Sequence, residues 1–385
     1  MSKEQNKNDE QLQTLPPEQN QTDAPSIKKL SKATTSLARA NLLLVSFIAS
    51  VLLIACLKIG ASVILPILIA IFLSFVLEPP VRFFQKYKIP RIVAILTVIL
   101  IMLIVLGIVS IILYNSIRSI ANNLGFYEKR SMEIYKLAAS VFNLPFDEHL
   151  SFFDNVWNQA NVRKTVQDLI LSFSGSFISN TVKLVTILII TIFLMMEASF
   201  LQKKLEVALA DNFSIDIQKI ASNIITSITR YLSIKFFVSL ATGLLVWLFL
   251  ALLKLDFAVI WGVLSFILNF IPTFGSIAAG ASVIGFALLQ FWPSPMPVIW
   301  AAIIMISINM VIGNIIEPHV QGQNLGLSTF VVLTSLLVWG WIWGFAGLVL
   351  SVPMTVIIKI ICEEIPGLRP IAIIMSTHKE VSNSR

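Results

Sequence analysis

The chain has 385 residues, of which 56% are hydrophobic and only 13% charged, and its formal net charge is +7. Soluble globular chains carry about 25% charged residues, so this composition excludes an ordinary soluble domain. Apolar runs of this kind cross a bilayer as helices, because lipid offers their backbone no hydrogen-bond partners. The composition therefore predicts an all-α polytopic membrane protein.

The first 40 residues are polar and rich in Gln, Asn and Lys, and they are predicted to be a disordered cytoplasmic tail. They contain no apolar segment followed by a cleavage site, so no removable signal peptide is predicted. Eight apolar runs follow, and a bilayer core of about 30 Å suits such runs. They are Asn41–Ile59, Ser62–Leu77, Ile92–Tyr114, Ile178–Met196, Phe236–Leu253, Phe257–Ile271, Ile277–Trp292 and Val298–Ile316.

A last apolar block, Ser328–Cys362, is interrupted by the sequence WGWIWG at residues 339–344. Its first arm, residues 328–338, would be roughly 16 Å of helix, which is too short to cross a bilayer. We therefore expect a re-entrant-type helical hairpin with a tryptophan-rich turn. A bent pair of full spans is the alternative.

Lysine and arginine near the span ends predict the orientation. They gather before the first span, between the second and third, and between the fourth and fifth, so eight crossings place all three groups in the cytoplasm with both termini. The predicted segments are a tail (1–40), helices 1–3 (41–114), an extracytoplasmic helical insert (115–176), helix 4 (177–198), cytoplasmic amphipathic helices (199–235), helices 5–8 with the hairpin (236–364) and a cytoplasmic tail (365–385).

Polar residues end the eighth apolar run, where α-helical spacing places Asn314 and Glu317 on one face. Pro318 disfavours helix at the residue before it, so the helix is expected to stop near Glu317. A carboxylate within a membrane is costly and often functional. We therefore interpret Glu317 as a cation or proton site with Asn314 beside it. The alternative places Glu317 at the headgroup level, with Asn314 bonding a neighbouring helix.

A second break lies at Asn269, Pro272 and Gly275. An interrupted helix exposes backbone groups that contact solutes in transporters, and Asn269 would line such a path. A tight cytoplasmic turn between two spans is the alternative. The sequence from Glu78 to Arg82 ends the second span. It is either a helix stop with a local ion pair or a second charged site that faces Glu317.

Trp339, Trp341 and Trp343 are either interfacial anchors or side chains that line a path within a re-entrant hairpin. Gly340 and Gly344 between them match the short GxxxG packing motif.

Sequence motifs for hydrolases, zinc proteases and phosphate-binding loops are absent from the chain. The three histidines are scattered and the two cysteines lie in apolar runs. We therefore predict no enzyme activity, no cofactor, no metal site and no nucleic-acid partner.

Several motifs lie along the chain: NFIPTFG at 269–275, NIIEP at 314–318 with Gly322, LGLS at 325–328, WGWIWG at 339–344, Gly347 and Pro353, together with Glu78-Pro79. In these motifs the C-terminal third resembles the autoinducer-2 exporter family of bacterial permease-like proteins. The resemblance covers about residues 42–362. One departure is Thr329, where the family often has proline.

The resemblance implies an inner-membrane protein with about eight spans that forms a homo-oligomer. Family members are described as exporters of autoinducer-2, and others as sodium or lithium/proton antiporters.

The leading hypothesis is a secondary transporter of a small polar solute, with Glu317 as the ionisable group. Its gate would include Pro272, Gly275, Pro318, Gly322, Gly340 and Gly344. Exchange of a monovalent cation for protons is the second hypothesis, and a non-transporting membrane scaffold assembling through the outer insert is the third. An intramembrane protease would need paired catalytic residues inside the spans, and these are not visible.

Overall fold

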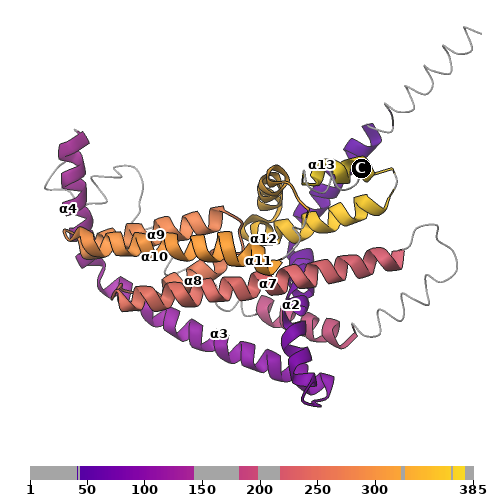
Figure 1. Cartoon of the computed structure of the whole chain (residues 1–385), viewed down its shortest axis with the longest axis horizontal. Coiled ribbons are helices and arrows are strands. Elements are labelled where there is room, and N and C mark those ends of the chain that lie inside the picture. Colours follow the sequence, from indigo (N-terminus) through magenta and orange to yellow (C-terminus); the bar gives the residue numbers. More distant parts are fainter. Residues whose placement is uncertain are drawn as a thin grey trace, which may run out of the picture. The chain divides into compact units, whose positions relative to one another are not determined.

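The structure is a computed structural model that describes residues 41, 44–142, 182–197, 217–321, 326–365 and 367–377. Residues 1–60 and 61–385 form two separate units. In the first unit the described helix is Leu44–Ile59. The second unit holds all the elements considered below (Figure 1). Within the described residues, the secondary structure is helical apart from a single β-bridge between Leu327 and Ser376.

Six described helices are long and apolar enough to cross a membrane, which confirms the predicted all-α polytopic fold. They are α2 (Ala61–Gln85), α3 (Arg91–Asn122), α7 (Ile217–Leu252), α9 (Phe274–Phe291), α10 (Pro295–Val311) with its extension, and α12 (Thr329–Glu364). Helix α12 is counted here at its full length, although it is bent at Gly344 into two arms. Each of the eight predicted runs contains a helix, including one at residues 182–197. The sixth run differs from the prediction, because its helix α8 (Ala258–Leu268) has 11 residues and is too short to cross alone.

Helices α7, α8, α9 and α10 lie side by side in Figure 1 and share one apolar core. Helix α7 meets α8 through two glycines: a Cβ on Gly243 or on Gly262 would lie 2.7 Å from the carbonyl oxygen of the other. Only glycine permits this backbone approach, so the two helices are held in close contact. The turn after α8 is equally tight, because a Cβ on Gly275 would lie 1.7 Å from the carbonyl oxygen of Leu268.

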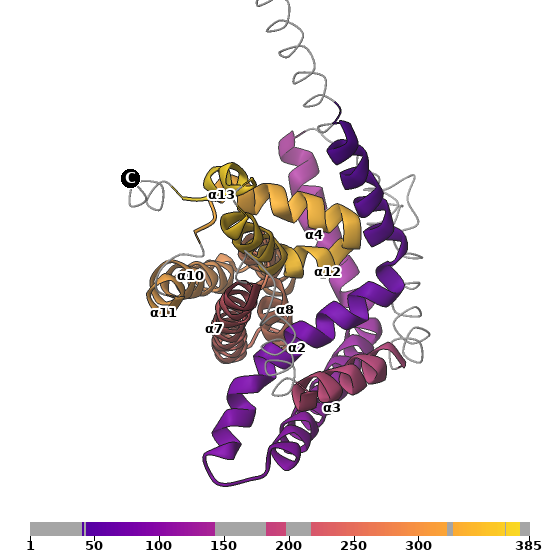
Figure 2. The same cartoon turned by 90° about the vertical axis from the view of Figure 1, so that its right-hand side faces the viewer.

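The predicted C-terminal hairpin is present within α12, and Figure 2 shows its two arms folded against each other. The chain reverses at Gly344, whose φ of 60° and ψ of −136° lie outside the helical region. The turn is therefore one glycine and not the whole WGWIWG sequence. The first arm, residues 329–343, is about 22 Å long, still shorter than a bilayer core.

The start of the hairpin is fixed despite the missing proline. The Ser328 side chain accepts a hydrogen bond from the backbone N–H of Val331 and so caps the first arm. A short helix, α13 (Arg369–Met375), returns to the same place, where the Ser328 N–H donates to the Met375 carbonyl at 2.9 Å. The hairpin then packs on α2 and α7 through a second apolar cluster that includes Phe72, Ile228, Leu232 and Leu350.

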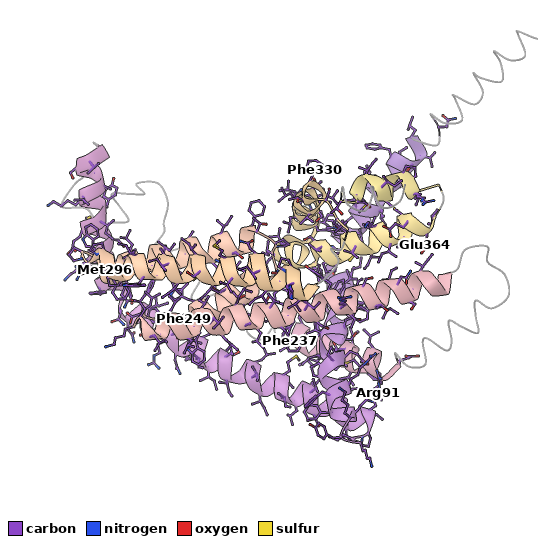
Figure 3. All side chains as sticks on the ribbon, in the orientation of Figure 1. Arg91, Phe237, Phe249, Met296, Phe330 and Glu364 are labelled. Carbon is purple, nitrogen blue, oxygen red and sulfur yellow. The ribbon has the colours of Figure 1, made fainter. Side chains whose placement is uncertain are left out.

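Large apolar side chains cover the outside of the second unit, as Figure 3 shows for Phe237, Phe249, Met296 and Phe330. Their exposed fractions run from 41% to 77%. Contiguous apolar surfaces of this kind mark contact with lipid or another protein. The second unit is therefore built to lie in a membrane.

The hairpin depends on Gly347, where a Cβ would lie 1.8 Å from the Trp339 carbonyl oxygen. Gly347→Ala should force the arms apart and destabilise the protein by about 1–3 kcal/mol. Gly285→Ala is the matched control, because a Cβ there meets no atom within 4 Å and alanine favours the helix by about 0.5–1 kcal/mol. Thermal unfolding of the purified protein measures both. Equal midpoints for the two variants would show that the arms tolerate separation.

Candidate functional site

The carboxylate of Glu317 is ion-paired. Its Oε1 lies 2.6 Å from Nζ of Lys235 on α7, and the two side chains are only 18% and 6% exposed. Lys235 stands where the apolar part of α7 begins, and Tyr231 is buried one turn before it. Two charges removed from water in this way are tolerated only as a pair, because each offsets the desolvation of the other.

A π-helical turn, η1 (Ile312–Ile316), directs Glu317 toward α7. The buried stripe of α10 runs through Ala301, Met305, Ile308 and Ile312 in α-helical steps of three and four residues. An α-helix would continue this stripe at residue 315 or 316, but both isoleucines there are exposed. The next inward residue is Glu317, five positions on, and its backbone N–H donates to the Ile312 carbonyl. The wider turn therefore places the carboxylate on the buried face.

Pro318 gives a physical reason for the π turn. Proline has no backbone N–H, and its ring clashes with the carbonyl four residues earlier in an α-helix, which here is that of Asn314. A wider turn relieves that clash, and π turns are frequent at functional sites. The prediction that the helix stops near Glu317 was wrong, because α11 (Glu317–Gln321) continues it.

The same turn corrects the predicted polar face. Asn314 is exposed, while Glu317 turns inward to Lys235. The α-helical spacing that placed them side by side fails because the π turn adds a residue between successive inward positions. Gly322, predicted as part of this break, lies outside the described residues.

The break at residues 269–273 lies beside the same face of α7. The Asn269 side-chain amide donates to Oγ of Ser239 at 3.0 Å, and both residues are buried. Ser239 follows Lys235 by one helical turn, so the two contacts are about 6 Å apart along α7. The turn contains Pro272 and Thr273, which has a φ of 63°, and Gly275 follows. The structure thus brings two predicted sites, Glu317 and Asn269, to one stripe of α7.

Glu78 belongs to a different cluster. It pairs with Arg82 at 2.9 Å and with Arg91 of α3 at 3.3 Å, and Arg91 also donates to the Met195 carbonyl at 3.0 Å. The local ion pair expected from the sequence is therefore present, but the expected helix stop is not, because α2 continues through Pro79 and Pro80 to Gln85. Within the described part of the chain, no hydrogen bond or ion pair joins Glu78 to Glu317.

The three tryptophans of the hairpin differ in their burial. Trp339 and Trp343 are buried with ring centroids 5.0 Å apart, while Trp341 is 64% exposed. Gly340 lies opposite Leu348 of the returning arm and Gly344 forms the turn. The buried pair packs ring against ring near the hairpin tip, whereas the exposed Trp341 is placed to contact lipid or another protein.

A polar network lies beside the C-terminal end of α7. The Tyr127 hydroxyl of α4 (Leu124–Phe142) donates to Asp256 at 3.0 Å, and the Asp256 N–H donates to the Gln290 side chain at 2.7 Å. Burial and the adjacent Asp256 carboxylate raise the pKa of Tyr127, so its phenol stays protonated. A shallow, open depression of about 560 Å³ lies nearby on the surface. Its lining includes Asn115, Ser116, Ser119, Trp247 and Phe257.

Sequence reasoning missed Lys235, which was counted among the basic residues of the predicted cytoplasmic amphipathic helices (199–235) and was not assigned to the site. One signal was available: Lys235, Ser239 and Thr242 repeat at steps of four and three, which places polar groups on one face of an apolar helix. A second buried lysine, Lys359, pairs with Glu363 at 3.2 Å on the returning arm of the hairpin. Among the described residues, no group of three His, Cys, Asp or Glu side chains is placed to hold a metal ion.

Comparison with known proteins identifies the chain's relatives. The profile described as "AI-2E family transporter" matches residues 45–367. A "Putative transport protein" of Haemophilus influenzae is 33% identical over 332 residues, covering 84% of this chain and 93% of the relative. A protein of the same name from Borreliella burgdorferi is 32% identical, and the match covers 85% of this chain and 88% of the relative. "AI-2 transport protein TqsA" of Escherichia coli is 30% identical, and the match covers 85% of this chain and 93% of the relative.

The buried pair makes a stability prediction. Lys235→Met leaves the Glu317 carboxylate buried without its partner, which should cost about 2–4 kcal/mol. The double variant Lys235→Met/Glu317→Gln should recover most of that loss, because no unpaired charge remains. Arg82→Ala is the matched control, since this partner of Glu78 is 72% exposed and should cost less than about 1 kcal/mol. Thermal unfolding of the purified variants tests this, and a double variant no more stable than Lys235→Met would contradict the pairing.

Proposed function

Because this chain belongs to the AI-2E family of transporters, we propose that it is a secondary transporter that exports a small polar solute across the bacterial inner membrane. The observation that carries the proposal is the buried Lys235–Glu317 pair, which lies where a helix is distorted and beside a second interrupted segment. Ionisable groups within membrane spans mark substrate or ion pathways.

The pair supplies a coupling step. With both groups charged, Lys235 and Glu317 satisfy each other and hold α7 against α11. A proton delivered to Glu317 removes its negative charge and releases the Lys235 ammonium to other acceptors. A solute oxygen then accepts from Lys235, and the Asn269 amide beside it offers a second donor. The Glu317 carboxylate and the solute oxygen thus compete for Lys235, and protonation of Glu317 favours the solute.

The discontinuous segments supply the movement. The π turn at 312–316 and the turn at 269–273 each lack a regular helical hydrogen-bond ladder, and interrupted helices serve as gates in transporters. The hairpin packs on α7 around Ile228 and Leu232, within two turns of Lys235. A change at the pair is therefore transmitted to the hairpin through α7.

The open depression at the other end of α7 is a candidate second contact site for the solute. Asn115, Ser116 and Ser119 offer hydrogen bonds there, and Trp247 and Phe257 offer aromatic faces. This mixture suits a small hydroxylated molecule. One relative is named "AI-2 transport protein TqsA", so autoinducer-2 is the first solute to test.

Cation exchange is the second candidate. Glu317 is 18% exposed and its Oε1 contacts Lys235, so sodium or lithium would have to displace the ammonium group. In this proposal the cation and the proton compete for Glu317. The exposed apolar faces, Trp341 included, suit a homo-oligomer in the bilayer. A scaffold role would instead depend on the insert at 115–176, of which residues 143–176 lie outside the described part.

Everted membrane vesicles test the proposal. An imposed pH gradient is followed by a fluorescent dye while autoinducer-2, sodium or lithium is added. Wild-type vesicles should collapse the gradient with the transported species, and Glu317→Gln should lower the rate at least tenfold because the proton-binding carboxylate is gone. Glu133→Gln, which changes a half-exposed carboxyl on α4, is the matched control.

Two outcomes would contradict the coupling mechanism. One is a Glu317→Gln variant that transports at the wild-type rate. The other is a response to sodium or lithium with none to autoinducer-2, which would support the antiporter instead. Equal membrane content of the variants is checked by immunoblotting.

A further inference from the structure

The polar site does not end at the Lys235–Glu317 pair. Along α7, Lys235, Ser239 and Thr242 are all buried, with exposed fractions of 5% or less. Their spacing of four and three residues places them on one face of the helix, over a rise of about 10 Å. This buried polar stripe enters the apolar part of α7 and so leads inward from the pair.

Helix α8 presents a matching stripe. Gly262, which contacts α7 at Gly243, and Asn269, which bonds α7 at Ser239, lie on the same face of the α8 segment. Ser265 lies between them at helical spacing and is only 3% exposed. Its side chain therefore faces α7 at the level of the polar stripe.

The Ser265 hydroxyl has no hydrogen-bond partner among the described residues. A buried hydroxyl without a partner is costly, and in native proteins such groups are commonly bonded to water. The neighbours bond elsewhere: the Thr242 hydroxyl donates to the Val238 carbonyl, and the Asn269 amide donates to Ser239. Both the Thr242 hydroxyl and the Asn269 carbonyl oxygen retain acceptor capacity for a water molecule.

The stripe has a definite inner end. At Gly243 and Gly262 the two backbones approach so closely that a Cβ on either would lie 2.7 Å from the other's carbonyl oxygen. Beyond this contact the inward face of α7 is apolar, with Val246 and Leu250 both fully buried. Polar groups are therefore confined to one side of the glycine contact.

We propose that Ser239, Thr242, Ser265 and Asn269 form a water-binding path that extends the site from the Lys235–Glu317 pair to the glycine contact. The proposal rests on the transport function and adds its ligand class, which is water. Water held at Ser265 keeps the inner side of the pair hydrated, so a proton or a solute hydroxyl can be exchanged there. The glycine contact stops the water column, which prevents a leak across the membrane.

Thiol accessibility tests the path without measuring transport. The two native cysteines, exposed Cys56 and buried Cys362, are first replaced by alanine. Single cysteines are then placed by Ser265→Cys and, as the matched control beyond the glycine contact, by Val246→Cys. The membranes are treated with silver ion, which is small and reacts with thiolate formed in water. The thiols left are alkylated with N-ethylmaleimide in denaturant and counted by mass spectrometry.

Ser265→Cys should react with silver ion at least tenfold faster than Val246→Cys. Equal, slow reaction at both positions would overturn the path, because it would mean that the Ser265 position is dry. This result would leave the proposed transport function standing, since that function is tested by the flux of Glu317→Gln.

A second variant guards against a misfolded cysteine protein. Ser265→Ala removes the hydroxyl. If the Ser265 hydroxyl has neither water nor a protein partner, the Ser265→Ala variant should unfold at a higher midpoint temperature than the wild type. If water binds there, the midpoint should stay the same or fall, which is the result expected here. A clear rise would overturn the proposal.

Discussion

The structure depends on one constraint, which is that two charged side chains are shielded from bulk solvent between α7 and α11. Lys235 and Glu317 are buried to different degrees, and their charged atoms are 2.6 Å apart. A buried pair is seldom a net source of stability, because desolvation opposes the attraction. We therefore propose that the pair serves transport, since a pair that a proton or a solute can divide is suited to it.

Backbone geometry keeps the two charges together. The π turn places Glu317 on the inward stripe of α10, and Pro318 makes that turn favourable. Tight glycine contacts fix the surroundings: Gly243 against Gly262, Gly275 against the end of α8, and Gly347 within the hairpin. The rigid contacts thus lie next to segments with irregular hydrogen bonding, and in the proposed transport cycle the irregular segments are the ones expected to move.

Much of the fold followed from the sequence, because apolar runs in lipid have few structural solutions. The runs, the hairpin and the break at residues 269–275 were predictable in this way. The site was predictable only in part. Glu317 and Asn269 stood out as polar residues in apolar surroundings, but their partners Lys235 and Ser239 are distant in sequence. The π turn was also missed, because a pattern read at 3.6 residues per turn contains no sign of an added residue. The presence of Thr329 in place of proline did not indicate that the Ser328 side chain would cap the first arm of the hairpin.

Charge exchange tests the central claim most directly. Lys235→Glu and Glu317→Lys each place two like charges together, whereas the double variant restores an opposite pair with the positions reversed. Solute flux is measured in proteoliposomes containing equal amounts of each protein. The account predicts that each single variant is inactive and that the double variant recovers a measurable part of the wild-type flux. Single variants that transport normally would contradict the claim that this pair controls transport.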